Sequence, residues 1–189
     1  EKALSLRESL RTSGEEDAMA PEHEEWSWSE ANLRRFLLKD SSAALELLNG
    51  LFDGGRRDPE LLEALSELLT EHRDWDRLRK VLETVIDNGD AQNVHFEMLA
   101  SLLEVRYRDL PAASLVLGRG ATHYTEDVTL ARRLVEVLRV LDGGEEGQEL
   151  IDALGNLVEV TGGAALKADL LFELGQLFEE EANRTSAAI

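Results

Sequence analysis

A repeat period of 34 residues constrains the fold of this chain more than any other feature of its sequence. Apolar residues recur at this spacing in five columns, the first of which holds Trp28, Leu62, Phe96 and Leu130. The other columns hold Leu69, Leu103 and Val137; Ala44, Leu78 and Ala112; Leu48, Leu82, Val116 and Leu150; and Leu51 and Val85. A fixed period of this length predicts a stack of equivalent repeats that bury their apolar faces against one another. Trp28 is expected to fill the bulky site of the first repeat, equivalent to Leu62 and Phe96.

The repeats are predicted to be helical. Leu, Ala, Glu and Arg recur at spacings of three and four, while the alternating pattern of β-strands is almost absent. Helix starts are expected at a capping box formed by Ser27 and Glu30, and at Asp40, Asp58, Asp74, Asp109 and Thr125. Helix ends are expected at Gly54–Gly55, Gly89 and Gly143–Gly144. Short connections between helices of roughly 10 to 17 residues predict antiparallel neighbours.

The chain is predicted to begin with a separate segment before the repeats. Residues 1–14 place Ala3, Leu6 and Leu10 on one face of a short helix, and residues 15–26 form an acid-rich connector with little periodicity. The array is expected over 27–189, with repeats at about 27–58, 59–92, 93–126, 127–167 and a partial one at 168–189. Trp26 is expected either to cover the end of the array or to act as an exposed aromatic anchor for a partner.

The last stretch of the chain, LLFELGQLFEEEANRTSAAI, carries a recognisable pattern of large, Leu, Gly, aromatic and Ala positions, filled by Leu171, Leu174, Gly175, Phe178 and Ala187. With the 34-residue period, this resembles the tetratricopeptide-repeat (TPR) family over about 27–189. The resemblance implies an all-α fold, a right-handed α-solenoid of stacked antiparallel helix pairs. The chain departs from the family pattern at Arg133 and Arg35, which stand where other repeats have leucine, and the usual closing proline is missing. A related helical-hairpin repeat is the alternative.

No motif in the sequence indicates catalysis or a metal site. The four histidines, His23, His72, His95 and His123, show no i, i+4 pair and no HExxH. LGRGATH, at 117–123, lacks the lysine and hydroxyl of a phosphate-binding loop and is expected to be a loop between repeats. Neither GxSxG nor cysteine is present. We therefore expect a protein that is not an enzyme and that binds no cofactor or metal.

Charge restricts the class of partner. Thirty-nine acidic against twenty basic residues give a formal net charge of −19, which disfavours nucleic acid and anionic membrane surfaces and favours basic proteins or peptides. No apolar run approaches the roughly 20 residues that cross a bilayer, and the first thirty residues do not resemble a signal peptide. A cytoplasmic location is expected, with a flanking anchor or export signal left open.

A row of acidic residues marks the candidate binding surface. The TPR resemblance implies that the first helix of each hairpin lines a concave groove, and these helices carry Glu63, Glu67, Glu71, Glu97 and Glu104. Like charges four residues apart cost roughly 0.2–0.5 kcal/mol per pair in a helix. Two explanations are open: a solvated face, or an acidic groove that attracts a Lys- or Arg-rich segment. A carboxylate clamp of the kind some TPR proteins use is disfavoured, because Glu63 and Glu97 stand where it would need cations.

A second feature is the local excess of arginine between residues 106 and 139. Arg132 and Arg139, seven residues apart, share a helix face and are expected either to pair with acids of a neighbouring repeat or to form a second docking patch, for example for another copy of the chain. The function expected from the sequence is a non-catalytic protein–protein interaction module that binds a basic segment in an acidic groove. The alternatives are homo-oligomeric self-assembly and an intramolecular scaffold or regulatory arm of a larger protein.

Overall fold

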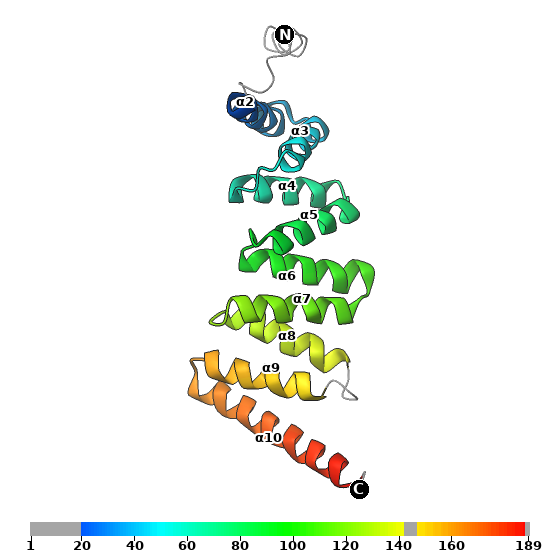
Figure 1. Cartoon of the computed structure of the whole chain (residues 1–189), viewed down its shortest axis with the longest axis vertical. Coiled ribbons are helices and arrows are strands. Elements are labelled where there is room, and N and C mark those ends of the chain that lie inside the picture. Colours follow the sequence, from blue (N-terminus) through cyan, green and yellow to red (C-terminus); the bar gives the residue numbers. More distant parts are fainter. Residues whose placement is uncertain (1–19, 142–146, 188–189) are drawn as a thin grey trace. The chain divides into compact units, whose positions relative to one another are not determined.

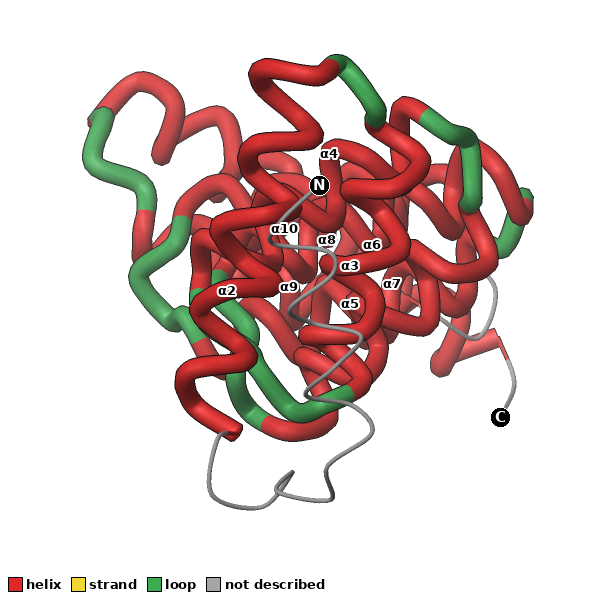
Figure 2. The backbone as a smooth tube through the Cα atoms, turned by 90° about the horizontal axis from the view of Figure 1, so that it is seen from above, coloured by secondary structure: helices red, strands yellow, loops and turns green. Residues whose placement is uncertain are grey.

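The computed structural model describes residues 20–141 and 147–187, and over these ranges the chain is helical, with short loops and no strand (Figures 1 and 2). The elements in chain order are α2 (Ala20–Asn32), η1 (Leu33–Leu38), α3 (Ser41–Asp53), α4 (Pro59–Glu71), α5 (Trp75–Asn88), α6 (Asn93–Leu102), η2 (Leu103–Tyr107), α7 (Leu110–His123), α8 (Val128–Leu141), α9 (Gly147–Val160) and α10 (Ala164–Ala187). Both η1 and η2 are π-helical. The predicted helix 1–14 and the predicted end at Gly143–Gly144 lie outside the described residues.

The chain divides into two compact units, residues 1–74 and 75–189, so the division falls between α4 and α5. In unit 1, α3 packs against α2 and η1 on one side and against α4 on the other. The buried apolar residues of α3 and α4 are Ala44, Leu48, Leu51, Phe52, Leu61, Leu62, Ala64, Leu65, Leu68 and Leu69. Burial of this leucine-rich surface is the main stabilising contribution in unit 1.

In unit 2, α5 to α10 follow one another as a stack in which each helix packs against the next (Figure 1). The first helices of two consecutive hairpins, α6 and α8, are also in contact. The core between α8, α9 and α10 consists of Ala131, Val135, Leu138, Ala153, Leu154, Leu157, Val158 and Leu170. Because consecutive helices pack against one another, unit 2 is a linear stack of helices.

Several helix boundaries follow the capping residues of the sequence. Oδ1 of Asp40 accepts a hydrogen bond from the N–H of Ala43 at 3.1 Å, and Oδ1 of Asp58 accepts one from the N–H of Leu61 at 3.0 Å. These bonds satisfy backbone donors of the first turns of α3 and α4. α3 ends directly before Gly54–Gly55, where Gly55 has a φ of 106°, a conformation that favours glycine. These predicted boundaries are confirmed.

Two predicted helix starts are wrong. α2 begins at Ala20, so Ser27 lies within the helix, where it is buried instead of capping a terminus. α2 also extends into the predicted acidic connector. The cap of α8 is Asp127 and not Thr125, since Oδ1 of Asp127 accepts a hydrogen bond from the N–H of Leu130 at 3.1 Å. A carboxylate is a stronger N-cap acceptor than a threonine hydroxyl, and it lies directly before the helix.

The predicted 34-residue period appears directly in side-chain contacts of unit 2. Nδ2 of Asn93 donates to Oδ2 of Asp127 at 2.6 Å, and Nε of Arg139 donates to Oε1 of Glu173 at 2.9 Å; both pairs are 34 residues apart. The hydroxyl of Tyr124 donates to a backbone carbonyl 33 residues earlier. Residues about one repeat apart along the chain are therefore neighbours in space, as a stacked repeat requires.

One inserted residue shifts the later columns of the repeat. The first residues of α4 and α5 are 16 positions apart, whereas those of α6 and α7 are 17 positions apart. The π-helical turn η2 accommodates the extra residue before α7. As a result α7 buries Ala113 and Leu117, while the predicted core residues Ala112 and Val116 are only half-buried.

The same shift explains the apparent departure at Arg133. Counted from the caps of their helices, Leu65 follows Asp58 by seven residues, and the seventh residue after Asp127 is Leu134. Leu134 packs against the core of unit 2. Arg133 therefore does not occupy a leucine position, and the repeat is more regular than the fixed 34-residue spacing indicated.

The prediction that Trp28 fills a core site is wrong. In α2 the buried residues are Ser27 and Ala31, whereas Trp28 is half-buried. The π-helical turn η1 shifts the register of the first repeat in the same way as η2 shifts the third. The Trp28 ring instead forms a cation–π contact with the guanidinium of Arg56, whose Cζ lies 4.9 Å from the ring centroid.

Two further segments differ from their predicted structure. LGRGATH lies within α7 and is not a loop. The TPR-like stretch near the end of the chain lies on one continuous helix, α10, which also contains Ala187. Leu170 is the buried residue there, while Leu171 and Phe178 are 50% and 53% exposed. A second helix of that hairpin is not formed within the described residues.

Candidate partner-binding surface

The predicted acidic residues of unit 1 form one line along α4. α4 begins at Pro59 after the Asp58 cap. The helical spacing of its residues places the leucines toward the core and the glutamates outward. Glu60, Glu63, Glu67 and Glu71, all exposed, are spaced by three and four residues and so share a helix side. We call these four residues the acidic ridge. Glu60 was missed by the sequence analysis, although its spacing to Glu63 continues the pattern.

Only one member of the acidic ridge has a cationic partner within the described part of unit 1. Arg35, at the π-helical turn η1, forms a short ion pair with Glu67. No ion pair involves Glu60, Glu63 or Glu71 among the described residues. The ridge therefore retains negative charge on both sides of its single neutralised position.

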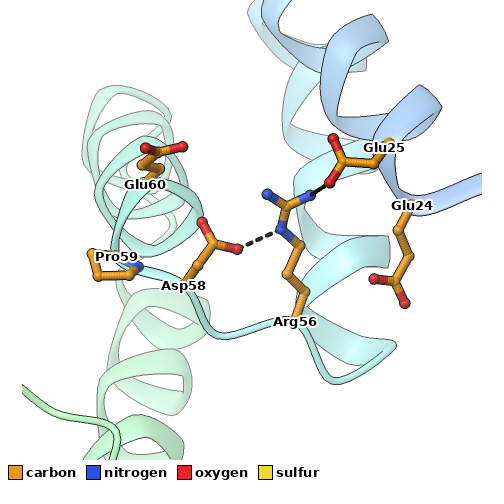
Figure 3. A pocket seen from close by; sticks show the side chains of 6 residues that line it. All are labelled: Glu24, Glu25, Arg56, Asp58, Pro59 and Glu60. Atoms are coloured by element: carbon orange, nitrogen blue, oxygen red, sulfur yellow. Dashed lines mark hydrogen bonds and ion pairs between the residues drawn. The ribbon is translucent and has the colours of Figure 1, made fainter. Parts of the chain in front are cut away.

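The ridge begins at a pocket of about 480 Å³ in unit 1, lined by Glu24, Glu25, Arg56, Asp58, Pro59 and Glu60 (Figure 3). Arg56 stands between the two acidic sides of this pocket. Its guanidinium forms an ion pair with Asp58 and a longer one, 3.8 Å, with Glu25 of α2 (Figure 3). The pocket therefore contains four carboxylates and one cation.

The protonation states of the pocket follow from these contacts. The hydrogen bond to Asp58 raises the pKa of Arg56 above its ordinary value. Burial raises the pKa of Asp58, but hydrogen bonds from Arg56 and from the backbone N–H of Leu61 outweigh burial, so the pKa of Asp58 lies below its usual value. Both groups are charged at neutral pH, and the pocket keeps an excess of negative charge.

Glu24 and Glu25 are not among the predicted site residues, because the predicted connector covers 15–26. The structure instead begins α2 at Ala20, so both residues lie on that helix. On α2 they lie opposite the start of α4 (Figure 3). Trp26, the next residue, is 70% exposed and belongs to the same helix.

Two of the four predicted site residues of unit 2, Glu104 and Arg139, form ion pairs. Arg133 donates to Glu104 at 2.8 Å and also pairs with Glu136 at 3.1 Å. Arg139 binds Glu173 of α10 through two hydrogen bonds, one of 2.9 Å and one of 2.5 Å. The predicted pairing of Arg139 with an acid of the neighbouring repeat is thus observed.

Two residues of unit 2 remain as candidates for external contacts. Glu97 on α6 is half-buried and Arg132 on α8 is exposed. Both are the fifth residue after the caps of their helices, Gln92 and Asp127, so they occupy equivalent positions in consecutive repeats. The charge at this position therefore changes sign from α6 to α8, and unit 2 presents a mixed surface.

The described residues contain no group of histidine and carboxylate side chains that could hold a metal ion. His95 is buried, and its Nδ1 accepts a hydrogen bond from the backbone N–H of Gln92 at 2.9 Å, so it caps α6. His72 contacts the hydroxyl of Ser41 at 3.1 Å. No helix in the described part of the chain has the length and hydropathy needed to cross a bilayer.

Comparison with known proteins gives structural likeness without sequence similarity. No protein-family model and no curated protein matches the chain. The crystal structure of YrrB, a TPR protein with an unusual peptide-binding site, has a TM-score of 0.52 at 15% identity, over 84% of this chain and 77% of YrrB. Two crystal structures of MamA have TM-scores of 0.54 and 0.50 at 13% and 14% identity, over 89% and 82% of this chain and 97% and 96% of theirs. Together with the helical hairpins and their 34-residue contacts, this likeness shows that the chain has an all-α, TPR-like helical-repeat fold.

Proposed function

We propose that this chain is a non-catalytic protein-interaction module that binds a basic segment of a partner protein through the acidic ridge of α4 and the pocket beside it. The observation that carries the proposal is the set of exposed carboxylates at Glu60, Glu63 and Glu71, which have no ion partner among the described residues. Glu60 and Glu63, three residues apart on one side of the helix, repel each other by roughly 0.2–0.5 kcal/mol. A cationic ligand removes this repulsion on binding.

The acidic ridge ends at the pocket, which offers a site for one basic side chain of the partner. Arg56 neutralises part of the charge of Asp58 and Glu25, which leaves Glu24 and Glu60 at the pocket to receive a cation. A lysine side chain suits such a site, since its ammonium group is a compact donor on a flexible apolar stem. Charge complementarity of this kind contributes mainly to selectivity and to the rate of encounter.

Other sequence candidates take secondary roles in this proposal. Trp26 is an exposed aromatic side chain on α2 and is suited to anchor an apolar residue of the partner. Glu97, on α6 of unit 2, is a separate candidate for a basic residue of a partner, whereas Glu104 is already paired with Arg133. The peptide-binding site described for YrrB, a protein with the same fold, supports a peptide-like partner.

The test is a titration of the whole chain with a fluorescein-labelled lysine-rich peptide, and with a glutamate-rich peptide of equal length as the negative probe. We expect Glu63→Lys and Glu71→Lys each to weaken binding of the lysine-rich peptide by roughly five- to tenfold, and added salt to weaken it further. Glu46→Lys is the matched control, because Glu46 is an exposed glutamate of α3 outside the ridge. Equal losses in the Glu63 and Glu46 variants would show that only net charge matters and would refute the ridge as the site.

Self-assembly is a second candidate function, favoured by apolar residues that α10 leaves exposed. Leu171, Phe172 and Phe178 are 50%, 70% and 53% exposed. A second docking patch at Arg132 and Arg139 is less favoured, since Arg139 already binds Glu173. Light scattering over a range of protein concentrations tests the idea: association that Phe172→Ser abolishes supports it, and a monomer at every concentration rejects it.

A further inference from the structure

Three consecutive large apolar residues are exposed at the π-helical turn η1. Phe36, Leu37 and Leu38 are 56%, 74% and 62% exposed. We call these three residues the apolar turn. A run of exposed apolar side chains is unfavourable in water and indicates a contact surface for a partner. π-helical turns are themselves frequent at functional sites. The acidic ridge alone does not explain this feature of unit 1.

Arg35 connects the apolar turn to the acidic ridge. Its guanidinium lies over the Phe36 ring, with Cζ 4.7 Å from the ring centroid, and it also forms the ion pair with Glu67. The Arg35 side chain is only 20% exposed, so most of this cation is covered. Phe36 therefore lies beside the middle of the ridge, at the position where the charge of the glutamate is already balanced.

The ridge offers different chemistry at its middle and on either side of it. Glu63 on one side and Glu71 on the other have no ion partner among the described residues, and both attract a cation. At the middle, a further cation would meet the guanidinium of Arg35, whereas an apolar side chain would meet the exposed part of the Phe36 ring. A ligand that complements this surface therefore carries an apolar residue between two basic ones.

The spacing of the ridge fits an extended chain. Residues four apart in a helix are separated by about 6 Å along its axis, so Glu63, Glu67 and Glu71 span about 12 Å. Alternate residues of an extended segment lie on one side and are about 6.6 Å apart, so three of them span about 13 Å. The two spacings agree to about 1 Å over this length. Five residues of an extended segment are thus enough to reach all three positions.

A helical ligand fits less well. The same three contacts would need residues at i, i+4 and i+8, and hence a helix of at least nine residues. Isolated helices shorter than about 12–15 residues are marginal in water, so a segment of that length would lose further free energy on ordering. The extended form needs only the five residues that make or join the contacts.

We propose that the partner segment is an extended stretch with the pattern basic-x-apolar-x-basic. Its two basic side chains bind Glu63 and Glu71, and its apolar side chain packs on Phe36. Arg35 determines specificity at the central position, because it neutralises Glu67 and repels a further cation. This inference rests on the function proposed above and names the class of sequence that the ridge accepts.

The first experiment compares two fluorescein-labelled peptides with identical flanks, one containing Lys-Ser-Phe-Ser-Lys and the other Lys-Ser-Lys-Ser-Lys. Fluorescence anisotropy with the whole chain gives the ratio of their affinities. We expect the parent to bind the Phe-centred peptide about threefold more tightly, although it carries less charge. Phe36→Ser is expected to weaken that peptide about threefold and to leave the Lys-centred one unchanged. Leu115→Ser, at a 70% exposed position of α7, is the matched control and is expected to change neither.

Arg35→Gln tests the specificity at the centre. Glutamine keeps most of the side-chain stem but leaves the charge of Glu67 unbalanced, so we expect the preference to reverse in favour of the Lys-centred peptide, by about threefold or more. Lys80→Gln removes the same charge from an exposed position of α5 and is expected to retain the preference of the parent. Circular dichroism of each variant checks that the helices are intact.

The outcomes separate this inference from the function on which it rests. If neither Phe36→Ser nor Arg35→Gln changes the affinity ratio while Glu63→Lys weakens both peptides, the ridge is the site but its central position is not selective, and the inference is wrong. If neither peptide binds the parent more tightly than a glutamate-rich peptide does, the proposed function fails as well. Tighter binding of a peptide with the same Lys, Phe and Lys at helical spacing, four residues apart, would overturn the extended geometry.

Discussion

Gly120 of α7 lies so close to Phe96 of α6 that a β-carbon on Gly120 would stand 3.0 Å from both Cβ and Cγ of the phenylalanine. Phe96 has little room to withdraw. It is 5% exposed, and its ring packs edge-on against Tyr124, with the ring centroids 6.1 Å apart. The absence of a side chain at Gly120 therefore allows the two helices of this hairpin to approach around a bulky core residue.

This contact gives a prediction with an internal control. We expect Gly120→Ala to lower the free energy of unfolding by about 1–3 kcal/mol, because the added methyl group overpacks the site. Gly118, in the same helix, has open space around the position of a β-carbon. Gly118→Ala is expected to raise the free energy of unfolding by about 0.5–1 kcal/mol through helix propensity. Urea denaturation followed by circular dichroism measures both, and a gain in both variants would show that Phe96 can move aside.

Capping residues and helical spacing in the sequence predict the stacked helical repeats. They do not predict which residues of each helix face the core. The caps at Asp40 and Asp58 and the end at Gly54–Gly55 depend only on neighbouring residues, and the structure has them as predicted. The register depends on η2, where one extra residue is absorbed as a π-helical turn. No local pattern marks that insertion, so the fixed spacing predicts Ala112 in the core, whereas the structure buries Ala113.

The candidate surface was likewise only partly visible in the sequence. The line of Glu63, Glu67 and Glu71 follows from helical spacing alone. The pairing of Glu67 with Arg35 joins residues 32 positions apart and depends on how α2 and η1 pack, which composition does not reveal. The glycines of LGRGATH indicated a loop, yet tertiary packing of Phe96 against Gly120 places them inside α7.

A second prediction concerns backbone conformation at the ends of three helices. Lys39, Arg73 and Arg108 have φ values of 56°, 57° and 56°, in the left-handed region that costs a residue with a side chain about 1–2 kcal/mol. Glycine avoids this cost but loses about 0.5–1 kcal/mol through the greater freedom of the unfolded chain. We expect Arg108→Gly to raise the free energy of unfolding by about 0.5–1 kcal/mol. Arg108→Ala retains a β-carbon and is expected to give no gain in the free energy of unfolding. If Arg108→Ala stabilises the chain as much as Arg108→Gly does, the gain comes from the loss of the arginine charge and not from the backbone conformation.

The third prediction concerns acid sensitivity at His95. Burial lowers the pKa of His95 below its ordinary value, and its Nδ1 must stay unprotonated to accept the N–H of Gln92. The unfolded chain therefore binds a proton more readily than the folded one. The stabilisation is present above the unfolded pKa of about 6.5 and is lost as the pH falls toward the lower folded value.

His95→Gln tests this assignment, because glutamine at the third position of a helix also closes a capping box but does not titrate. We expect the fall in the free energy of unfolding between pH 7 and pH 5 to be smaller in this variant than in the parent. Val94→Gln, which places a glutamine at an exposed position of the same helix and removes no titratable group, is the control and is expected to leave the slope unchanged. The assignment fails if the His95 variant and the parent lose stability in parallel over this range.

The last prediction concerns Asp127, which joins two consecutive repeats. Its Oδ1 accepts the N–H of Leu130 in the first turn of α8, and its Oδ2 accepts Nδ2 of Asn93 on α6 at 2.6 Å. The hydrogen bond from Asn93 is the main cause that lowers the pKa of Asp127. We expect Asp127→Ala to cost about 1–2 kcal/mol, since it removes a cap, and Asn93→Ala about 0.5–1 kcal/mol, since it removes one hydrogen bond.

The pH dependence separates the two contributions of Asp127. A lowered folded pKa means that its stabilisation is present above the unfolded pKa of about 3.9 and is lost as the pH falls below it. Asn93→Ala weakens the hydrogen bond that sustains the shift, so we expect the loss of stability between pH 5 and pH 3 to be shallower in this variant than in the parent. Asp127→Asn keeps a capping oxygen without the charge, and we expect it to retain most of the stability at neutral pH. If the double variant of Asn93 and Asp127 costs the sum of the single ones, the two side chains act independently, and the contact between α6 and α8 rests on their apolar residues alone.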